Sequence, residues 1–455
     1  MSLFRSCGLK KMSLSSCRRL QHSSQQRSST QQVHPDWLRR VLEDRDRPSR
    51  LYAWTTENID VNASGAGHIT RKEAAISKEH QKRIYVLGVG NIGRLYAMCL
   101  AKHIDRPPIT LVVHRKELLE HWAARPGIEL TRYGQIQRNA NFDIEWWTDA
   151  KPATGPIEEP ALGGKISNLI VATKASDAIP QVDRLRGYLS SSSTVAFTQN
   201  GMCKLWPPLG ETYVNARFEK GASPSWLACV TTHGVTSEGA FRSTHAAPAT
   251  ALVGPVIPNN SGNGCMEYLM ERIASAPDLA ARQVSKKELW VSQLEKLVVN
   301  AIINPLTAVL RCKNGELFIQ RDDCLPEIID RLLGEASEAL QALIMDPTSD
   351  AILVETANGQ SLEAEREKLK DRFSFDRLRN MIYDVGAKVA ENTSSMLQDV
   401  RAGKQTEIND FNGWLIETER FIDGELQLLT HERLVSLVQT QAALSRADIG
   451  RELLR

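Results

Sequence analysis

The sequence predicts an α/β domain built on a parallel, doubly wound sheet, followed by an all-helical domain, with a cleft between them. Strand-like and helical segments alternate from residue 83 to about residue 283, as is typical of a parallel sheet covered by helices. From about residue 286 the strand signal is absent and long helical patterns follow. A narrow polar stripe on the first of these helices indicates a surface that lines a cleft.

The first strand and helix carry a glycine motif. RIYVLGVGNIGRLYAMCLAKH runs strand, glycine turn and helix, which is the setting that a GxGxxG match requires. Gly88 permits the tight turn, Gly90 lets the backbone approach a pyrophosphate, and Gly93 lets the helix pack on the strand. The helix start favours phosphate through its free N–H groups and dipole. The alternative is a glycine-rich turn without a ligand. We predict a Rossmann-type dinucleotide site at Gly88, Val89, Gly90, Asn91, Ile92 and Gly93.

The end of the next strand indicates which dinucleotide binds. NAD-dependent enzymes place an acid there for the ribose hydroxyls, but this chain has His114, Arg115 and Lys116. An acid would repel a 2′-phosphate, whereas Arg115 can bind one with two parallel hydrogen bonds. NADP(H) is therefore favoured over NAD(H). An ordinary solvated basic strand end is the alternative, and it competes more strongly for Lys116 than for Arg115.

The remaining elements follow from the same patterns. The Pro/Gly-rich segment 151–164 is expected to be a surface loop. The charged segment 363–380 is expected to be a solvated helix face. Helix breaks are expected near 345–350 and at Asn358–Gly359. Further strands are predicted at 109–116, 165–175 and 193–201, and then within WLACVTTHGVTSEGAF and TALVGP.

The polar stripe lies on KLVVNAIINPLTAVLRCKNGEL, an otherwise apolar segment that begins at residue 296. Residues four apart on a helix advance by about 40°, so the stripe is only about 80° wide. An ordinary surface helix has a broader and more charged polar face. Such a stripe either lines a cleft or simply faces solvent. Its members are Gln293, Lys296, Asn300, Asn304 and Thr307.

Composition limits the class of protein. The 455 residues suffice for two or three domains, and 42% hydrophobic with 24% charged residues is typical of a soluble globular protein. No apolar run reaches the roughly 18 residues of a transmembrane helix. The eight cysteines show no ligand spacing, so we expect reduced thiols and no metal site.

The N-terminal segment 1–35 has a composition of its own. Its stretch MSLFRSCGLKKMSLSSCRRLQHSSQQRSSTQQ is rich in Arg and Ser, and the first acidic residue of the chain is Asp36. This predicts a mitochondrial transit peptide, with a disordered basic tail and a cytoplasmic protein as the alternative. Without its six basic residues the chain keeps 50 of 56 basic side chains against 54 acidic ones. A mildly acidic body argues against a nucleic-acid-binding protein. Residues 36–82 form an extension with one helix expected near Trp37–Leu42.

Several motifs together resemble the ketopantoate reductase (2-dehydropantoate 2-reductase) family over most of residues 83–455. The resemblance implies a cofactor domain at 83–283 and a helical substrate domain at 284–455, with the active site in the interdomain cleft. It also implies NADPH-dependent reduction of 2-dehydropantoate to pantoate, toward pantothenate and coenzyme A. The motifs are GVGNIG, TKA at Lys174, QNGM (199–202), TTHG (231–234), KLVVNAIINPLTA, CKNGEL, and SSMLQD with TEI (394–399 and 406–408).

The resemblance further implies roles for individual residues. Lys296 is expected to be the catalytic general acid, with Glu407 as a second catalytic residue. Residues expected to contact the cofactor or to help close the site are Lys174, Asn200, Val235 and Glu407. Residues expected to bind the substrate are Asn200, Lys296, Asn300, Asn304, Asn314 and Ser395.

The chemistry of ketone reduction agrees with these roles. Hydride addition leaves an alkoxide, and a lysine ammonium near the carbonyl oxygen can polarise it and then donate a proton. Partial burial would lower the lysine pKa and ease that donation. Ser395 falls near a helix start, which suits a carboxylate, and Gly403 could end that helix so that Glu407 approaches the site. The alternative for Glu407 is an exposed acid that complements a helix dipole.

Departures from the family pattern leave the substrate open. The first 82 residues, the segment 151–164 and extra length at 345–375 are additions, and Thr430-His431-Glu432-Arg433 replaces a Pro-x-Asn turn. A reductase of another branched 2-keto acid is therefore an alternative. A catalytically silent mitochondrial NADP-binding protein with a regulatory role is a second alternative, against which the retained lysine and asparagines argue. A homodimer is compatible with the sequence but not indicated by it.

Overall fold

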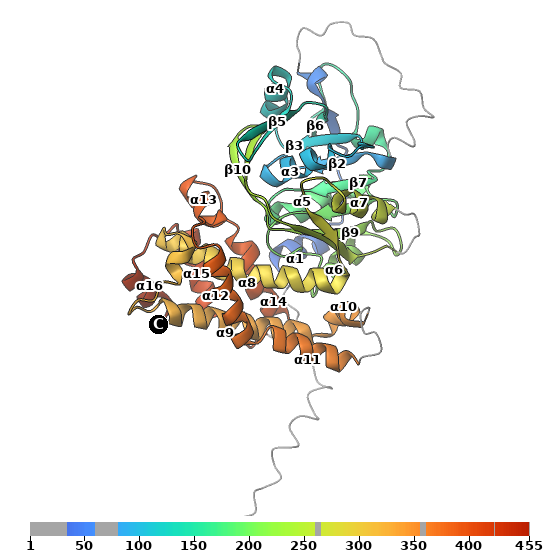
Figure 1. The fold of residues 1–455 in the computed structure, drawn as a ribbon. Coiled ribbons are helices and arrows are strands. Elements are labelled where there is room, and N and C mark those ends of the chain that lie inside the picture. Colours follow the sequence, from blue (N-terminus) through green and yellow to red (C-terminus); the bar gives the residue numbers. More distant parts are fainter. Residues whose placement is uncertain (1–33, 60–80, 260–264, 355–360, 423, 455) are drawn as a thin grey trace, which may run out of the picture. The chain divides into compact units, whose positions relative to one another are not determined.

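The computed structural model describes residues 34–59, 81–259, 265–354, 361–422 and 424–454. Residues 1–33 of the predicted transit peptide lie outside these ranges, as does the helix break predicted at Asn358–Gly359. From Pro35 to Arg455 the chain forms one compact unit, with an α/β part followed by a helical part (Figure 1).

The α/β part is built on one large sheet. Among the described residues its strand order is β1-β6-β3-β2-β7-β8-β9-β12-β13. The six strands from β6 to β9 are parallel, while β1 and β12 run antiparallel to their neighbours β6 and β9. These six follow the order 3-2-1-4-5-6 of a doubly wound dinucleotide-binding sheet, with the switch point between β2 and β7. The strands are β1 (Tyr52–Trp54), β2 (Ile84–Leu87), β3 (Ile109–Val113), β6 (Asp143–Thr148), β7 (Asn168–Val171), β8 (Thr194–Phe197), β9 (Ser225–Thr231), β12 (Ala251–Ile257) and β13 (Ala281–Gln283).

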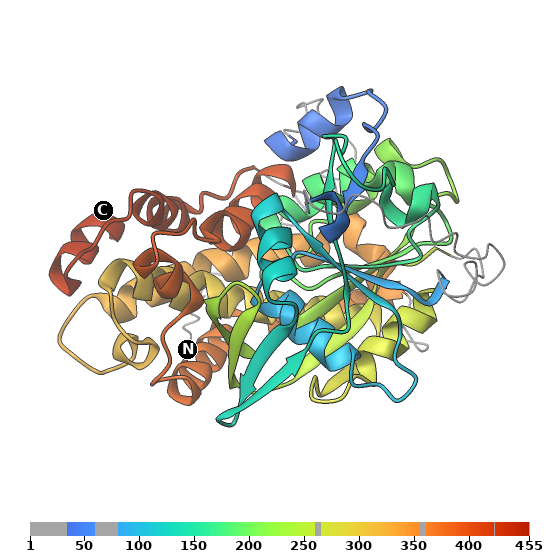
Figure 2. The ribbon, with the colours of Figure 1, turned by 90° about the horizontal axis from the view of Figure 1, so that it is seen from above.

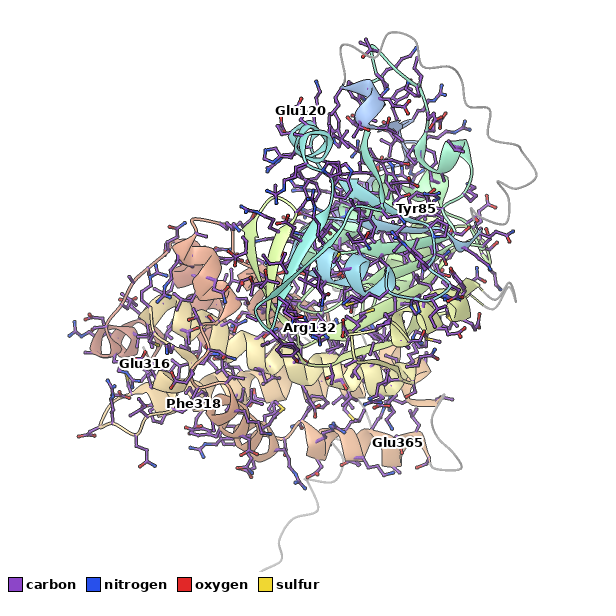
Figure 3. All side chains as sticks on the ribbon, turned by 45° about the horizontal axis from the view of Figure 1, so that its top comes forward. Tyr85, Glu120, Arg132, Glu316, Phe318 and Glu365 are labelled. Carbon is purple, nitrogen blue, oxygen red and sulfur yellow. The ribbon has the colours of Figure 1, made fainter. Side chains whose placement is uncertain are left out.

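A second, smaller sheet has the order β10-β11-β4-β5. Its strands are β4 (Ile128–Arg132), β5 (Gln135–Asn139), β10 (Gly234–Gly239) and β11 (Arg242–Ala247). The turn between β4 and β5 has positive φ at both Tyr133 and Gly134, which matches the right-handed twist of a hairpin. Arg132, labelled in Figure 3, pairs with Asp278 at 2.5 Å.

Helices cover the large sheet and form the remainder of the chain. Those of the α/β part are α3 (Asn91–Leu100), α4 (Lys116–Ala124), α5 (Ala175–Arg184), α6 (Gly210–Arg217) and α7 (Cys265–Ala274). Those of the helical part are α8 (Lys286–Leu310), α9 (Leu325–Met345), α10 (Asp350–Val354), α11 (Leu362–Arg372), α12 (Phe375–Lys388), α13 (Ser395–Arg401), α14 (Ile408–Ile422), α15 (Leu429–Gln439) and α16 (Arg446–Leu453). In Figure 2 the red helices near the C-terminus lie to the left of the blue and green strands.

Two apolar cores lie on the two faces of the large sheet. Leu169 and Val171 of β7 contribute to one core and Ile170 to the other, as the alternation of side chains along a strand requires. The first core continues through Leu297 and Ile302 of α8 into the helical part. Helix α8 contacts both β9 and β12 of the sheet and α13, α14 and α15 of the helical part. It therefore carries residues that face both parts of the chain.

The N-terminal extension completes the sheet edge. Helix α1 (Asp36–Glu43) packs against α6 and buries Leu38 and Val41, so the helix predicted near Trp37–Leu42 is confirmed. Strand β1 pairs with β6 and takes the edge position. Because β1 covers β6, the backbone N–H and C=O groups on that side of β6 are not open to pairing with another chain. The extension thus has a structural role that its sequence did not reveal.

Several predicted boundaries differ from those of the structure. The charged segment 363–380 is not one helix, because α11 ends at Arg372 and α12 begins at Phe375. Glu365 of α11 is buried and pairs with Lys287 of α8, so this segment is not wholly solvated (Figure 3). The break near 345–350 is confirmed by the short 3₁₀ turn Pro347–Ser349. None of the helices in the described ranges combines the length and apolar character needed to cross a membrane.

Candidate active site

The glycine turn lies at the switch point of the large sheet. Gly88 has φ +95°, and a Cβ there would lie 2.9 Å from the backbone of Ala172, so only glycine fits without strain. A Cβ on Gly93 would lie 2.0 Å from the carbonyl oxygen of Gly88. Gly90 differs, because no atom lies within 4 Å of the position its Cβ would take. This open space at the start of α3 leaves room for a phosphate group to approach the backbone.

Two side chains that follow the turn hold it against the hairpin β10–β11. Buried Arg94 donates to the carbonyl oxygens of Val89 and Gly90 at 3.1 and 3.2 Å, and to that of Gly239 at 2.8 Å. Burial lowers the pKa of Arg94 to about 10. Asn91 donates to the carbonyl oxygen of Val235 at 3.1 Å. The structure therefore brings together Val89, Gly90, Asn91 and Val235, four of the residues predicted to contact the cofactor.

Arg115 lies just beyond β3, next to the glycine turn in the order of strands. It is the N-cap residue of α4, so the predicted strand 109–116 ends earlier, at Val113. The Arg115 side chain is exposed, and its Nε lies 3.8 Å from the carboxylate of Glu117. Arg115 is thus available to a 2′-phosphate, although Glu117 partly offsets its charge.

Lys296 is held between the two parts of the chain. Its Nζ donates to Oδ1 of Asn200, after β8, at 3.0 Å, and to the carbonyl oxygen of Thr231, at the end of β9, at 2.6 Å. Burial lowers the pKa of Lys296 to about 8, and the carboxylate of Glu407 opposes that shift. Two acceptors engage two of the three N–H groups of the ammonium, which leaves one for a bound ligand. The polar stripe therefore faces the α/β part at this position rather than solvent.

Glu407 lies one residue before α14, close to both Asn200 and Lys174. The pKa of Glu407 is raised to about 7, first by burial and then by the carboxylate of Asp410, while Lys174 and a hydrogen bond from Asn200 oppose the shift. This environment does not match the alternative of an exposed acid at a helix start. Asn200 consequently contacts both residues predicted to be catalytic.

Lys174 connects the α/β part to the segment that precedes Glu407. Its Nζ donates to the carbonyl oxygen of Gln405 and lies 3.4 Å from the carboxylate of Asp399 in α13. Lys174 itself is the N-cap residue of α5, next to the switch point. The contact is consistent with a residue that helps to close the site.

The remaining predicted substrate residues form a second group. Asn304 donates to Oδ1 of Asn300 at 3.3 Å and lies 3.5 Å from Oγ of Ser395. Ser395 is the first residue of α13, as expected, but it is Oγ of Ser394 that accepts the capping hydrogen bond from the backbone N–H of Leu397. The three side chains thus offer neutral polar groups along the stripe of α8.

Asn314 is less directly connected to this group. It lies in a short 3₁₀ turn after α8, and its backbone N–H donates to the carbonyl oxygen of Asn392 at 3.1 Å. The side chain is buried and its Oδ1 has no hydrogen-bond partner among the described residues. Such an orphaned acceptor is costly unless a ligand or water satisfies it.

A cavity of about 330 Å³ opens beside Lys296. Its wall includes Ser292 and Lys296 of α8, Thr232 after β9, and Arg282 of β13. Of the predicted substrate residues within the described ranges, Lys296 is the one that borders it. The cavity is therefore adjacent to Lys296 but is not bordered by Asn200, Asn300 or Ser395.

Two contributors to this arrangement were missed by sequence reasoning. Arg94 fixes the glycine loop, and Thr231 supplies a backbone carbonyl to Lys296. From the sequence, Arg94 resembles an ordinary polar residue of a surface helix. The acceptor at Thr231 is a backbone carbonyl, which every residue has, so no residue type indicates it. No group of three or more His, Cys, Asp or Glu side chains in the described part of the chain is placed to hold a metal ion.

Comparisons with known proteins agree with the fold and indicate the family. Residues 84–257 match the family model "Ketopantoate reductase PanE/ApbA", and residues 288–441 match its C-terminal model. Ketoisovalerate reductase BEA2 of Gibberella fujikuroi is 42% identical over 449 residues, covering 93% of this chain and 99% of that protein. Ketoisovalerate reductase of Beauveria bassiana is 38% identical over 457 residues, covering 92% and 99%. A structure of a probable 2-dehydropantoate 2-reductase from Bacillus subtilis shares the fold, with a TM-score of 0.53 at 20% identity, covering 79% of this chain and 99% of that one.

A dinucleotide-binding sheet, a helical second part and a lysine between them define a nicotinamide-dependent reductase of 2-keto acids. The chain belongs to the ketopantoate reductase family. The resemblance inferred from its motifs is thereby confirmed.

Proposed function

We propose that this chain is an NADPH-dependent reductase of a branched 2-keto acid, with 2-ketoisovalerate as its substrate. The two relatives named ketoisovalerate reductase support this substrate, because each matches more than nine tenths of the chain. This proposal takes the alternative considered from the sequence in preference to 2-dehydropantoate. The observation that carries the reaction type is the Lys296 ammonium, held by Asn200 and Thr231 with its pKa lowered to about 8.

Lys296 acts as the general acid in this mechanism. Its free N–H donates to the ketone oxygen and polarises the carbonyl group before the reaction. As the carbonyl carbon accepts a hydride, the oxygen becomes an alkoxide and takes the proton from Nζ. A pKa of about 8 keeps most of the amine protonated at neutral pH while it remains an effective donor.

The group of Asn300, Asn304 and Ser395 positions the carboxylate of the substrate. These side chains donate hydrogen bonds without adding a charge that competes with Lys296. Glu407, with its pKa raised to about 7, stands on the other side of Asn200. Its carboxylate favours the charged form of Lys296 and so keeps the donor ready.

NADPH fits the residues present. The glycine turn, with its open space at Gly90, suits the pyrophosphate, and Arg115 suits the 2′-phosphate. When bound, the dihydronicotinamide supplies the hydride. Asn91 and Arg94 hold the loop and the hairpin that would flank it.

The test is the oxidation of NADPH by the purified full-length chain with a panel of 2-keto acids. The panel contains 2-ketoisovalerate, 2-dehydropantoate, unbranched 2-oxobutanoate and pyruvate. We expect the highest kcat/KM with 2-ketoisovalerate. A preference for 2-dehydropantoate, which carries an additional hydroxymethyl group, would establish the second candidate function instead.

The outcome also decides whether the chain is an enzyme. A protein that binds NADPH tightly but reduces no member of the panel would match the silent regulatory alternative. The retention of Lys296, Glu407 and the polar stripe argues against that result.

A further inference from the structure

Trp206, Gln293 and Gly201 form a buried chain of hydrogen bonds next to Lys296. Nε1 of Trp206 donates to Oε1 of Gln293 at 2.6 Å, and Nε2 of Gln293 donates to the carbonyl oxygen of Gly201 at 2.7 Å. The side chains of Trp206 and Gln293 are 1% and 4% exposed, so water does not compete with either bond. Bonds in such surroundings are strong and costly to break.

The hydrogen bond from Gln293 to Gly201 links the helix that carries the general acid to the loop that contacts it. Gln293 precedes Lys296 by three residues, so both lie on one face of α8. Gly201 directly follows Asn200, whose Oδ1 accepts from Lys296 at 3.0 Å. The bond from Gln293 to Gly201 therefore closes a ring through Lys296 and Asn200.

The same loop is contacted from a second helix. Gly201 has φ +79°, and a Cβ there would lie 2.8 Å from the carbonyl oxygen of Asp410 in α14. The loop thus lies between α8 and the start of α14, where Glu407 is located. A side chain that fixes the Gly201 carbonyl also fixes the distance of Asn200 from both Lys296 and Glu407.

We propose that Gln293, oriented by Trp206, is a positioning residue that holds Asn200 at the ammonium of Lys296. In this role Gln293 acts through its hydrogen bond to the Asn200–Gly201 turn. The proposal deepens the proposed function, because it assigns a further residue to the proton-donating site. A misplaced Asn200 oxygen removes a favourable partner of the charged amine, so the pKa of Lys296 falls when the bond is lost.

The test uses Gln293→Met, which keeps the length of the side chain and removes both hydrogen bonds. We expect kcat to fall roughly 10- to 100-fold, the range for reacting groups displaced by about 1 Å. NADPH affinity should change less than kcat, because the glycine turn and Arg115, which suit the phosphates, lie away from Gln293. The alkaline limit of the kcat profile should move to lower pH. A folded variant with the parental kcat and pH limit, or with the limit moved to higher pH, would overturn the proposal.

A readout without turnover separates this proposal from the proposed function. The rate at which acetic anhydride acylates Lys296, followed by mass spectrometry across pH, reports the pKa of the amine in an inactive protein as well. In Gln293→Met that pKa should be lower than in the parent chain. Equal values would refute the positioning role even if no substrate is found.

Two further variants control for simple destabilisation. Ser337→Ala removes a buried hydrogen bond of 2.7 Å to the carbonyl oxygen of Phe373, away from the site. It should lower the Tm without moving the pKa of Lys296. Trp206→Phe removes one bond of the chain, and its effect should vanish in a Gln293→Met background. Additive effects of the two substitutions would contradict a shared role.

Discussion

The Nζ atom of Lys296 lies 3.0 Å from Oδ1 of Asn200, across a separation of 96 residues in the chain. This contact joins the long helix α8 to the carboxyl end of β8 in the large sheet. Because a carbonyl oxygen fixes the direction of one N–H, it also directs the remaining N–H groups of the ammonium. The proton donor is therefore oriented before any substrate arrives.

Replacement of Lys296 should separate catalysis from folding. Lys296→Met should lower kcat by roughly 10²- to 10⁴-fold, the range for general acid catalysis, while NADPH still binds. Stopped-flow measurement of a single turnover checks the first effect and cofactor fluorescence the second. Parental turnover in the variant would mean that water or Glu407 supplies the proton.

The same variant should be at least as stable as the parent chain, because it removes a partly buried charge. The pKa of Lys296 is lowered from 10.5 in the unfolded chain to about 8 in the folded chain. Below pH 8 the amine is charged in both states, so the folded state bears the full cost of desolvating that charge. The gain in Lys296→Met should therefore be largest below pH 8 and vanish as the pH rises to 10.5. Urea unfolding at several pH values tests this sign, and loss of the fold would identify Lys296 as a structural element.

The pH dependence of turnover should respond to Glu407. In the parent chain kcat for reduction should fall as the pH rises through about 8, where Lys296 loses its proton. The Glu407 carboxylate raises the pKa of Lys296, so Glu407→Gln should move this limit to lower pH. Glu432→Gln, which removes an exposed partner of Arg420, is the matched control and should leave the limit in place. An unmoved limit in Glu407→Gln would contradict the coupling.

Two glycines of the turn should respond differently to alanine. A methyl group on Gly90 meets no atom within 4 Å, and its φ of −76° suits any residue, so Gly90→Ala should fold normally. Its methyl group should instead obstruct the pyrophosphate and weaken NADPH binding. Gly93→Ala should lower the Tm, because its Cβ would lie 2.0 Å from the Gly88 oxygen. Undiminished NADPH affinity in Gly90→Ala would place the pyrophosphate elsewhere.

Arg115 should set the preference for NADPH over NADH. Loss of a charge-assisted phosphate bond costs on the order of 1.5–3 kcal/mol, so Arg115→Ala should narrow the preference about tenfold or more. Arg115→Lys keeps the positive charge but lacks the planar guanidinium group, so this variant should retain part of the preference for NADPH. Isothermal titration with both cofactors gives the ratio. Equal affinity in the parent chain would refute the assignment.

The N-terminal segment should direct the protein to mitochondria. A fusion of residues 1–40 to a fluorescent reporter should colocalise with a mitochondrial marker and be shortened after import. The matched control replaces the basic residues of the segment by glutamine. A diffuse cytoplasmic signal from the unmodified fusion would favour the disordered tail.

The sequence by itself indicated the α/β part followed by a helical part and the chemistry available. The glycine turn at Gly88 and Gly93 can be predicted from the sequence because only glycine fits at these positions. The polar stripe around Lys296 and Asn300 can also be predicted, because the periodicity of a helix depends only on residues close together in the sequence. By contrast the strand β5 was missed, since its residues are polar and largely exposed on both faces.

Tertiary structure alone decided the state of the proton donor. The acceptors of Lys296 come from Asn200 and from the backbone of Thr231, 65 residues away, and a backbone carbonyl has no signature in a sequence. The lowered pKa of Lys296 and the raised pKa of Glu407 both follow first from burial. Burial depends on which distant segments pack together, so a sequence can show that a lysine is present but not how readily it gives up its proton.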